Sequence, residues 1–183
     1  MELIRRLLIN RDLIKTIADN RDRLYRVALA WCGDAALADD LVQETMAISL
    51  QHHAQVRNPG CMKAWMHSVL SNCWKKHLRQ MRPDMDIDDA DLASDHDVEA
   101  ACSEQEIVEC VRRAILKLPV GQRQTLTLVD LGGFSYAEVA DTLDIPIGTV
   151  MSRLYAARQT LQKMLTRIRS SAPDNTRFLR RVK

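Results

Sequence analysis

Apolar residues recur every three or four positions through most of this 183-residue chain, which is the spacing of α-helices that bury one face. In the N-terminal half the pattern predicts helices over residues 11–31, 35–53 and about 62–81. Gly33 ends the first helix, the aspartate after it is placed to cap the second, and Asn58-Pro59-Gly60 is a loop signal. The positions expected to face the core in the first two helices are Leu13, Ile17, Leu24, Val27, Ala28, Trp31, Leu37, Leu41, Thr45 and Ile48.

The C-terminal half continues the helical pattern. A helix is expected over about 104–117, with a stop before Leu118-Pro119, and a further helix runs to Leu131. Gly132-Gly133 then breaks the pattern. The whole sequence therefore predicts an all-α fold.

Residues 134–158, FSYAEVADTLDIPIGTVMSRLYAAR, hold two short helical patterns joined by a turn. Ser135 and Glu138 have the spacing of a capping box at the start of the first helix. Pro146 fits the first turn of the second, where its missing N–H costs no hydrogen bond. This arrangement predicts a helix-turn-helix.

The second helix of this motif has two distinct faces. Its inward positions are Val150, Leu154, Ala157, Leu161 and Leu165. The outward positions mix small donors with cations, as a helix in a DNA major groove requires, and Gly148 lets backbone amides approach a phosphate. A helical hairpin with a merely solvated polar face is the alternative.

Charge is segregated along the chain, although the net charge is only +2. Residues 45–83 carry six Lys or Arg and no acid, whereas residues 84–111 carry eleven Asp or Glu and no base. Two basic regions separated by an acidic spacer suit a polyanionic partner. Residues 83–99 have too few apolar side chains to offset the entropy of ordering, which predicts a flexible linker.

The pattern thus predicts two small helical domains joined by a flexible acidic linker, the C-terminal one a helix-turn-helix domain. The expected boundaries are 1–82 for the first domain, 83–103 for the linker, 104–172 for the second domain and 173–183 for a basic tail.

The segment LPVGQRQTLTLVDLGGFSYAEVADTLDIPIGTVMSRLYAARQTL closely resembles the DNA-binding domain of extracytoplasmic-function (ECF) sigma factors. In that family the second helix contacts the −35 promoter element. The resemblance implies that DNA contacts come from Thr149, Ser152, Arg153, Tyr155, Arg158 and Lys163. Met151 and Ala156 stand where the family commonly has cations, so the −35 preference is expected to differ from that of relatives.

The N-terminal half supports the same resemblance. Asp39-Asp40-Leu41-Val42-Gln43-Glu44-Thr45 matches the family segment that docks on the β′ clamp helices of RNA polymerase, which implies polymerase-binding roles for Asp39, Asp40, Leu41, Gln43 and Glu44. Outward-facing Met46 and Leu50 beside these carboxylates are also typical of a partner surface.

Residues 63–72 resemble the family segment that opens the −10 element. The implied −10 contacts are Arg57, Asn58, Asn72, Trp74, Lys75, Lys76 and Arg79, in a basic groove with stacking groups for single-stranded DNA. Helical spacing predicts that Trp65 packs in the core, and we expect Trp74 to be partly exposed.

As an ECF sigma factor the protein is expected to bind core RNA polymerase (β′ clamp helices and β flap), promoter DNA and an anti-sigma factor. A helix-turn-helix regulator with an N-terminal sensing domain, and a helical adaptor that binds no DNA, are the competing hypotheses. We expect no enzymatic activity, cofactor or small-molecule substrate, because the chain has no phosphate-binding glycine loop.

The cysteines and the hydrophobic runs favour neither a metal or disulfide site nor a membrane span. Five cysteines without a C-x-x-C pair fit reduced, buried thiols better than a metal site or disulfides. No run approaches the ~20 apolar residues of a membrane span, and the N-terminus does not have the pattern of a signal peptide. A cytoplasmic location is expected.

Overall fold

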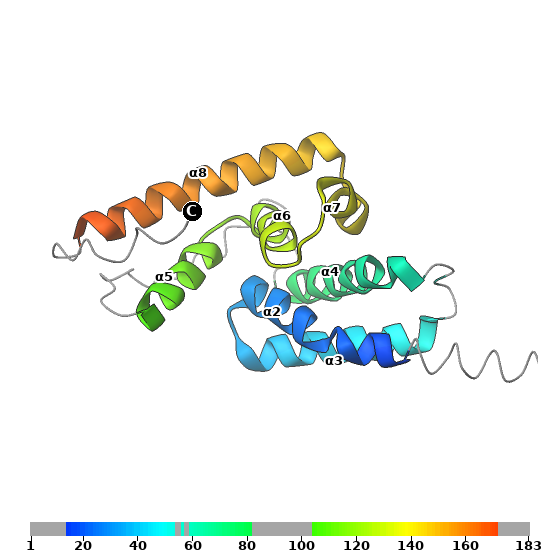
Figure 1. Ribbon diagram of the computed structural model, residues 1–183. Coiled ribbons are helices and arrows are strands. Elements are labelled where there is room, and N and C mark those ends of the chain that lie inside the picture. The colour runs from blue at the N-terminus through cyan, green and yellow to red at the C-terminus, as the bar shows by residue number, and fades with distance from the viewer. Residues whose placement is uncertain (1–13, 54–55, 57–58, 82–103, 172–183) are drawn as a thin grey trace, which may run out of the picture.

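The computed structural model describes residues 14–53, 56, 59–81 and 104–171, and all regular structure among these residues is helical (Figure 1). The N-terminal unit comprises α2 (Arg21–Cys32), α3 (Ala35–His52), the short 3-10 helix η2 (Pro59–Cys61) and α4 (Met62–Met81). The C-terminal unit comprises α5 (Glu104–Leu116), α6 (Val120–Asp130), α7 (Tyr136–Leu143) and α8 (Ile147–Ser171). The all-α prediction is confirmed, whereas the expected acidic linker and basic tail lie outside the described residues.

The first expected helix is interrupted once. Residues 14–19 are helical, and α2 starts only after Asn20, whose side-chain amide donates to the Thr16 carbonyl at 2.8 Å. Gly33 ends α2 in the left-handed region at φ 73°, which glycine adopts without strain. The Asp34 carboxylate then accepts the Leu37 amide at 2.8 Å, so the expected cap of α3 is confirmed.

The expected inward residues mostly form the core of the N-terminal unit. Every described one from α2 and from the short helix before it is at most 1% exposed: Ile17, Leu24, Val27, Ala28 and Trp31. On α3, Leu41 and Thr45 are buried as expected, but Leu37 and Ile48 are only half-buried. Small or branched neighbours, Ala38 and Val42, take the fully buried places instead.

The helix-turn-helix is confirmed in α7 and α8. The Ser135 hydroxyl accepts the Glu138 amide, and the Glu138 carboxylate accepts the Ser135 amide at 2.8 Å, which is the expected capping box. Asp144 ends α7 in the left-handed region at φ 56°. Val150, Leu154 and Ala157 of α8 are at most 3% exposed and fix its inward face.

The two units pack against each other. Helix α2 lies against α5 and α6, and α4 lies against α7 (Figure 1). One continuous core joins the N-terminal residues to Val120, Leu128, Phe134, Val139, Leu143 and Val150. The sequence predicted two domains but did not predict this contact between them.

Candidate nucleic-acid interface

The outward face of α8 presents most of the side chains expected to contact duplex DNA. Ser152, Tyr155, Arg158 and Lys163 are exposed, and Thr149 and Arg153 are half-buried. The Ser152 hydroxyl donates to the Thr149 carbonyl at 3.1 Å, so in this form it bonds to its own helix. The arrangement provides hydroxyl donors near the helix N-terminus, where the helix dipole favours an anion.

Two cations of this face rest on neighbouring elements. The Arg158 guanidinium donates to the Asp130 carboxylate at 2.9 Å, and this bond raises the pKa of Arg158. The Arg153 guanidinium lies over Gly121 of α6, where an added Cβ would come within 2.8 Å of its Cζ atom. Arg153 has to turn outward before it can reach a phosphate, whereas the exposed Arg158 has only to exchange Asp130 for the phosphate.

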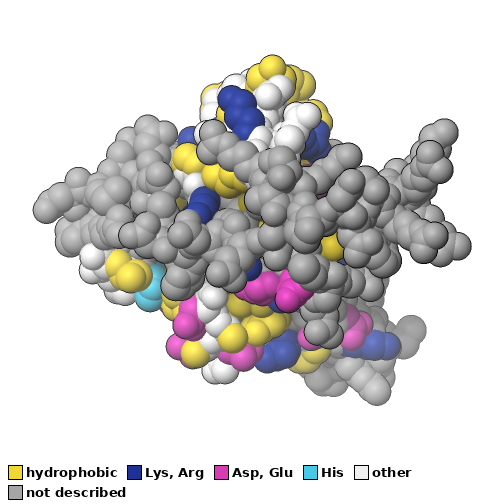
Figure 2. Space-filling model, turned by 90° about the vertical axis from the view of Figure 1, so that its left-hand side faces the viewer, with side chains coloured by type: hydrophobic (Ala, Val, Ile, Leu, Met, Phe, Trp, Pro, Cys, Tyr) yellow, Lys and Arg dark blue, Asp and Glu magenta, His cyan; other side chains and the backbone are white. Residues whose placement is uncertain are grey.

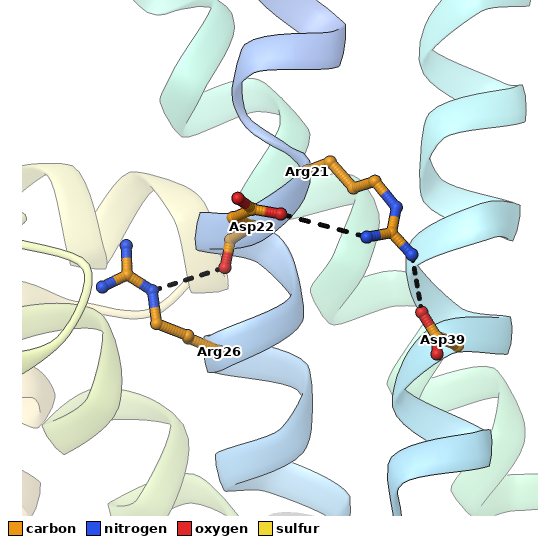
Figure 3. Close-up of polar contacts among 4 residues, drawn as sticks. All are labelled: Arg21, Asp22, Arg26 and Asp39. Carbon is orange, nitrogen blue, oxygen red and sulfur yellow. Dashed lines mark hydrogen bonds and ion pairs between the residues drawn. The ribbon is translucent and has the colours of Figure 1, made fainter.

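The α3 side chains expected to bind polymerase are partly engaged in ion pairs. Asp39 accepts from Arg21 of α2 at 2.8 Å, and Figure 3 shows Arg21 lying between Asp22 and Asp39. Glu44 accepts from Lys76 of α4 at 2.9 Å, which raises the pKa of Lys76. Such exposed ion pairs contribute little to stability, so a partner can replace them.

The remaining positions of this set differ in exposure. Asp40 and Gln43 are exposed on α3, whereas Leu41 is only 3% exposed and packs in the core. Met46 is half-buried and Leu50 is 42% exposed, so of these two apolar side chains Leu50 presents the larger surface. Viewed from one end, acidic side chains gather on the lower half of the molecule, where Figure 1 places the N-terminal helices (Figure 2).

The prediction that Trp74 is partly exposed is wrong. Its side chain is 3% exposed and stacks on His77 with ring centroids 5.8 Å apart. Leu70 and Leu78, one helical turn away on either side, are buried with it. Trp74 therefore cannot stack on a base in this form, whereas Trp65, expected in the core, is half-buried.

The other residues expected to contact the −10 element differ in exposure. Asn72, Lys76 and Arg79 are exposed on α4, and Lys75 is half-buried. Arg57 and Asn58 lie outside the described residues.

A stripe on α4, at every fourth residue from 63 to 75, contacts the C-terminal unit. Lys63 donates to the Gly132 carbonyl at 2.6 Å and lies 4.2 Å from the Phe134 ring centroid. The Ser71 hydroxyl accepts from the side-chain amide of Gln124 at 3.3 Å, and Lys75 donates to the Leu143 carbonyl at 3.5 Å. Two lysines of the segment expected to meet the −10 strand are thus engaged by the C-terminal unit.

His67 occupies the remaining position of this stripe. Its ring meets the Phe134 ring edge-on at 4.8 Å, and Nδ1 hydrogen bonds to the Lys63 carbonyl at 2.8 Å. Burial lowers the pKa of His67 to about 4, and the charges of Lys63 and Arg23 act in the same direction. The interface therefore holds this imidazole neutral at pH 7.

Arg123 is the polar centre of the interface and was not predicted from the sequence. It is 2% exposed and donates to the carbonyl of Trp31 at 2.5 Å, and also to those of Leu116 and Leu118. Trp31 and Leu116 lie in the last turns of α2 and α5, where carbonyls have no partner within the helix. One guanidinium thus satisfies the ends of two helices, one from each unit.

The described thiols are free. Burial raises the pKa of the Cys73 and Cys32 thiols, which disfavours the reactive thiolate form. Among the residues that the structure describes, no group of three or more His, Cys, Asp or Glu side chains is placed to hold a metal ion. In the same part of the chain no helix has the length and apolar character of a membrane span.

Comparison with protein families matches both units. Residues 16–83 match Sigma-70 region 2, and residues 108–161 match Sigma-70, region 4. The first match covers α2 to α4 and the second covers most of the C-terminal unit. A helix-turn-helix regulator with an unrelated N-terminal sensing domain does not account for the first match.

Individual relatives agree with this assignment. The ECF RNA polymerase sigma factor EcfG of Rhodopseudomonas palustris is 32% identical, over 78% of this chain and 78% of that protein. The RNA polymerase sigma-H factor of Pseudomonas aeruginosa is 33% identical, over 72% of this chain and 75% of that protein.

A solved structure shares the fold. The sigma factor RpoE of Bartonella quintana, solved in complex with the anti-sigma factor NepR, superposes with a TM-score of 0.69 at 24% identity. The match covers 85% of this chain and 98% of that one. With Sigma-70 regions 2 and 4 in order and these relatives at more than 30% identity, the chain belongs to the ECF family of RNA polymerase sigma factors.

Proposed function

We propose that this sigma factor directs promoter-specific initiation with α3 on the polymerase, α4 on the opened −10 strand and α8 in the major groove of the −35 element. The observation that carries the proposal is the separation of two polar outward faces. Asp40 and Gln43 are exposed on α3 of the region 2 unit, and Ser152 and Arg158 are exposed on α8 of the region 4 unit. The catalytic chemistry and its metal belong to the polymerase, so this chain contributes recognition in the cytoplasm and no reaction of its own.

The closed arrangement of the two units is, in this proposal, a resting form. Lys63 and Lys75 of α4 are bonded to carbonyls of the C-terminal unit and are therefore withheld from DNA phosphates. Polymerase binding and the capture of −10 DNA require these bonds to open. The interface combines hydrogen bonds, which water or DNA can replace, with an apolar core shared by the two units, so the polymerase complex has to compensate for the apolar side chains that opening exposes.

We extend the proposal to an anti-sigma factor. The related RpoE structure contains such a protein, NepR, which supports control of this chain by a partner of the same class. Titration of a purified candidate anti-sigma factor into a transcription reaction tests this point. Inhibition at stoichiometric amounts supports it, and full transcription at saturation of the binding site contradicts it.

The experiment for the proposed function is run-off transcription with core polymerase, the purified chain and a library of promoter fragments. Mapped start sites should share one −10 and one −35 element. The Asp40→Ala/Gln43→Ala double variant should lower polymerase binding, and Ser152→Ala with Arg158→Ala should lower promoter use without affecting polymerase binding. A chain that binds duplex DNA but never initiates with polymerase would instead be a helix-turn-helix regulator.

A further inference from the structure

Three large apolar side chains are exposed along one side of α8. Ile147, Met151 and Tyr155 are 47%, 51% and 69% exposed, and they follow one another at intervals of four residues. This spacing places them within an arc of about 80° on the helix surface. We call these three residues the apolar ridge.

The apolar ridge is separate from the core of the C-terminal unit. The inward line of α8 consists of Val150, Leu154 and Ala157, all at most 3% exposed. The ridge begins at the first residue of α8 and covers its first nine residues, the end of the helix that a helix-turn-helix inserts into DNA. At the top of Figure 2, where Figure 1 places this half of α8, apolar and basic side chains are exposed together.

The polar side chains around the ridge are turned back onto the protein. Arg158 is paired with Asp130, Arg153 lies over Gly121, and Ser152 bonds to the backbone of its own helix. Gln159 donates to the Tyr155 hydroxyl at 3.3 Å, which ties the end of the ridge to a polar side chain. The apolar ridge is therefore exposed beside polar side chains that bond within the protein.

A major groove offers one apolar group, the 5-methyl of thymine. Cations on a reading helix pair with guanine, whereas apolar side chains contact this methyl group. The ridge is continuous with the hydroxyl donors and the helix N-terminus that suit the flanking phosphates, so its surroundings fit a nucleic-acid groove. An isolated apolar patch on a soluble protein otherwise marks a protein partner.

Resting on the proposed −35 role of α8, we propose that Met151 and Tyr155, with Ile147 beside the first turn, read thymine methyl groups in the −35 duplex. The step that specifies the promoter is then an apolar contact with A·T pairs at positions where a cation would select G·C. Hydroxyl groups and basic side chains on the flanks hold the phosphates and set the position of the helix.

The test starts from duplexes that the full-length chain selects out of a randomised library. The selected site is resynthesised with 2′-deoxyuridine, which lacks the 5-methyl group, in place of each thymine. A second duplex carries deoxyuridine only in the flanks and serves as the DNA control. Because one buried methyl corresponds to about a fourfold change in a binding constant, binding should weaken by roughly fourfold for each thymine contacted.

Protein variants connect the methyl effect to the ridge. Met151→Ala should bind the thymine and deoxyuridine duplexes almost equally, while the slope of log affinity against log salt stays unchanged because no phosphate contact is lost. Ile107→Ala removes an exposed apolar side chain of α5 and should behave like the wild type. Met151→Lys should select sites with guanine near this position and steepen the salt dependence.

Each outcome decides between the proposals. Equal affinity of the wild type for the thymine site and for the site with deoxyuridine would overturn thymine reading, while duplex recognition by α8 would stand. If Met151→Ala instead lowers the affinity for the thymine duplex and for the deoxyuridine duplex by the same factor, thymine reading is overturned too. The ridge then belongs to folding or to a protein partner. If no duplex is enriched at all, the proposed −35 role itself is wrong, and the inference is lost with it.

Discussion

The indole Nε1 of Trp31 donates a hydrogen bond to the Thr127 hydroxyl at 2.7 Å, and this buried contact joins α2 of region 2 to α6 of region 4. The two residues are 96 positions apart in the sequence. The Thr127 hydroxyl in turn donates within its own helix, to the Arg123 carbonyl at 2.8 Å. The closed form therefore contains a buried chain of hydrogen bonds that crosses from one unit to the other.

Thr127→Val should loosen this closed form. Valine keeps the shape of threonine but leaves the buried Trp31 N–H without an acceptor, which costs about 1–3 kcal/mol. If closure competes with polymerase binding, the apparent affinity for core polymerase should rise by up to about tenfold for each 1.4 kcal/mol.

Thr125→Val is the matched control for this measurement. Thr125 is equally buried on α6, but its hydroxyl donates to the Gly121 carbonyl of the same helix at 2.7 Å. The affinity of the Thr125→Val variant for core polymerase should stay near that of the wild type. Unchanged or weaker binding by Thr127→Val, at normal stability of each unit, would contradict the competition.

Arg123→Met should be among the most destabilising single changes in the chain. It removes the donor to the Trp31 and Leu116 carbonyls at the ends of two helices and to the Leu118 carbonyl in the following loop, at a cost of about 2–4 kcal/mol in the free energy of unfolding. Urea unfolding measures it. Arg112→Met, which loses only an exposed pair with Glu109, should stay within about 0.5 kcal/mol of the wild type.

Acidification should open the closed form through His67. The folded pKa is about 4 and the ordinary value is 6.5, so between these pH values the separated or unfolded state binds a proton that the closed state does not. The contribution of neutral His67 to the free energy of unfolding is therefore fully present above pH 6.5. It is lost as the pH drops toward 4, by at most about 1.4 kcal/mol per pH unit.

Histidine replacement isolates this effect from the other titrating groups. Urea unfolding of His67→Gln at several pH values should show a shallower loss of stability between pH 6.5 and 4 than the wild type. The comparison uses slopes, so a constant destabilisation by the substitution does not affect it. Parallel slopes for the two proteins would rule out His67 as the group that titrates.

The capping box of α7 can be tested alone. Ser135→Ala removes the acceptor of the Glu138 amide and should lower the free energy of unfolding by about 1 kcal/mol. The same change should raise the pKa of Glu138 part of the way, because it removes the hydrogen bond from the Ser135 hydroxyl while the bond from the Ser135 backbone N–H, the larger cause of the lowered pKa, remains. Titration followed by NMR reads that pKa, and an unchanged value would mean that the box does not form in solution.

Helical spacing predicted the elements well because each helix buries a regular apolar face. The bounds of α4 and the capping box of α7 agree with the sequence, and so do the buried positions of α2. The error at Trp74 came from weighing its basic neighbours above its spacing. Leu70, Trp74 and Leu78 are four residues apart, and this pattern already indicates a buried face.

The contact between the units has a different origin and could not be predicted. Lys63, His67, Ser71 and Lys75 are polar residues at helical spacing, which by sequence alone resembles a solvated face. The two lysines donate to the backbone carbonyls of Gly132 and Leu143, and any sequence supplies such groups. Only the three-dimensional structure brings such donors and acceptors together.

Opening of the closed form can be measured as the distance between a pair of spin labels on exposed sites of α3 and α8, such as Ala47 and Gln159. The labels are placed on cysteines introduced after replacement of the native ones, in a variant that still supports run-off transcription. The free protein should give one short distance, and the complex with core polymerase and promoter DNA should give a longer one. The same short distance in the transcribing complex would contradict the proposal that the closed form must open.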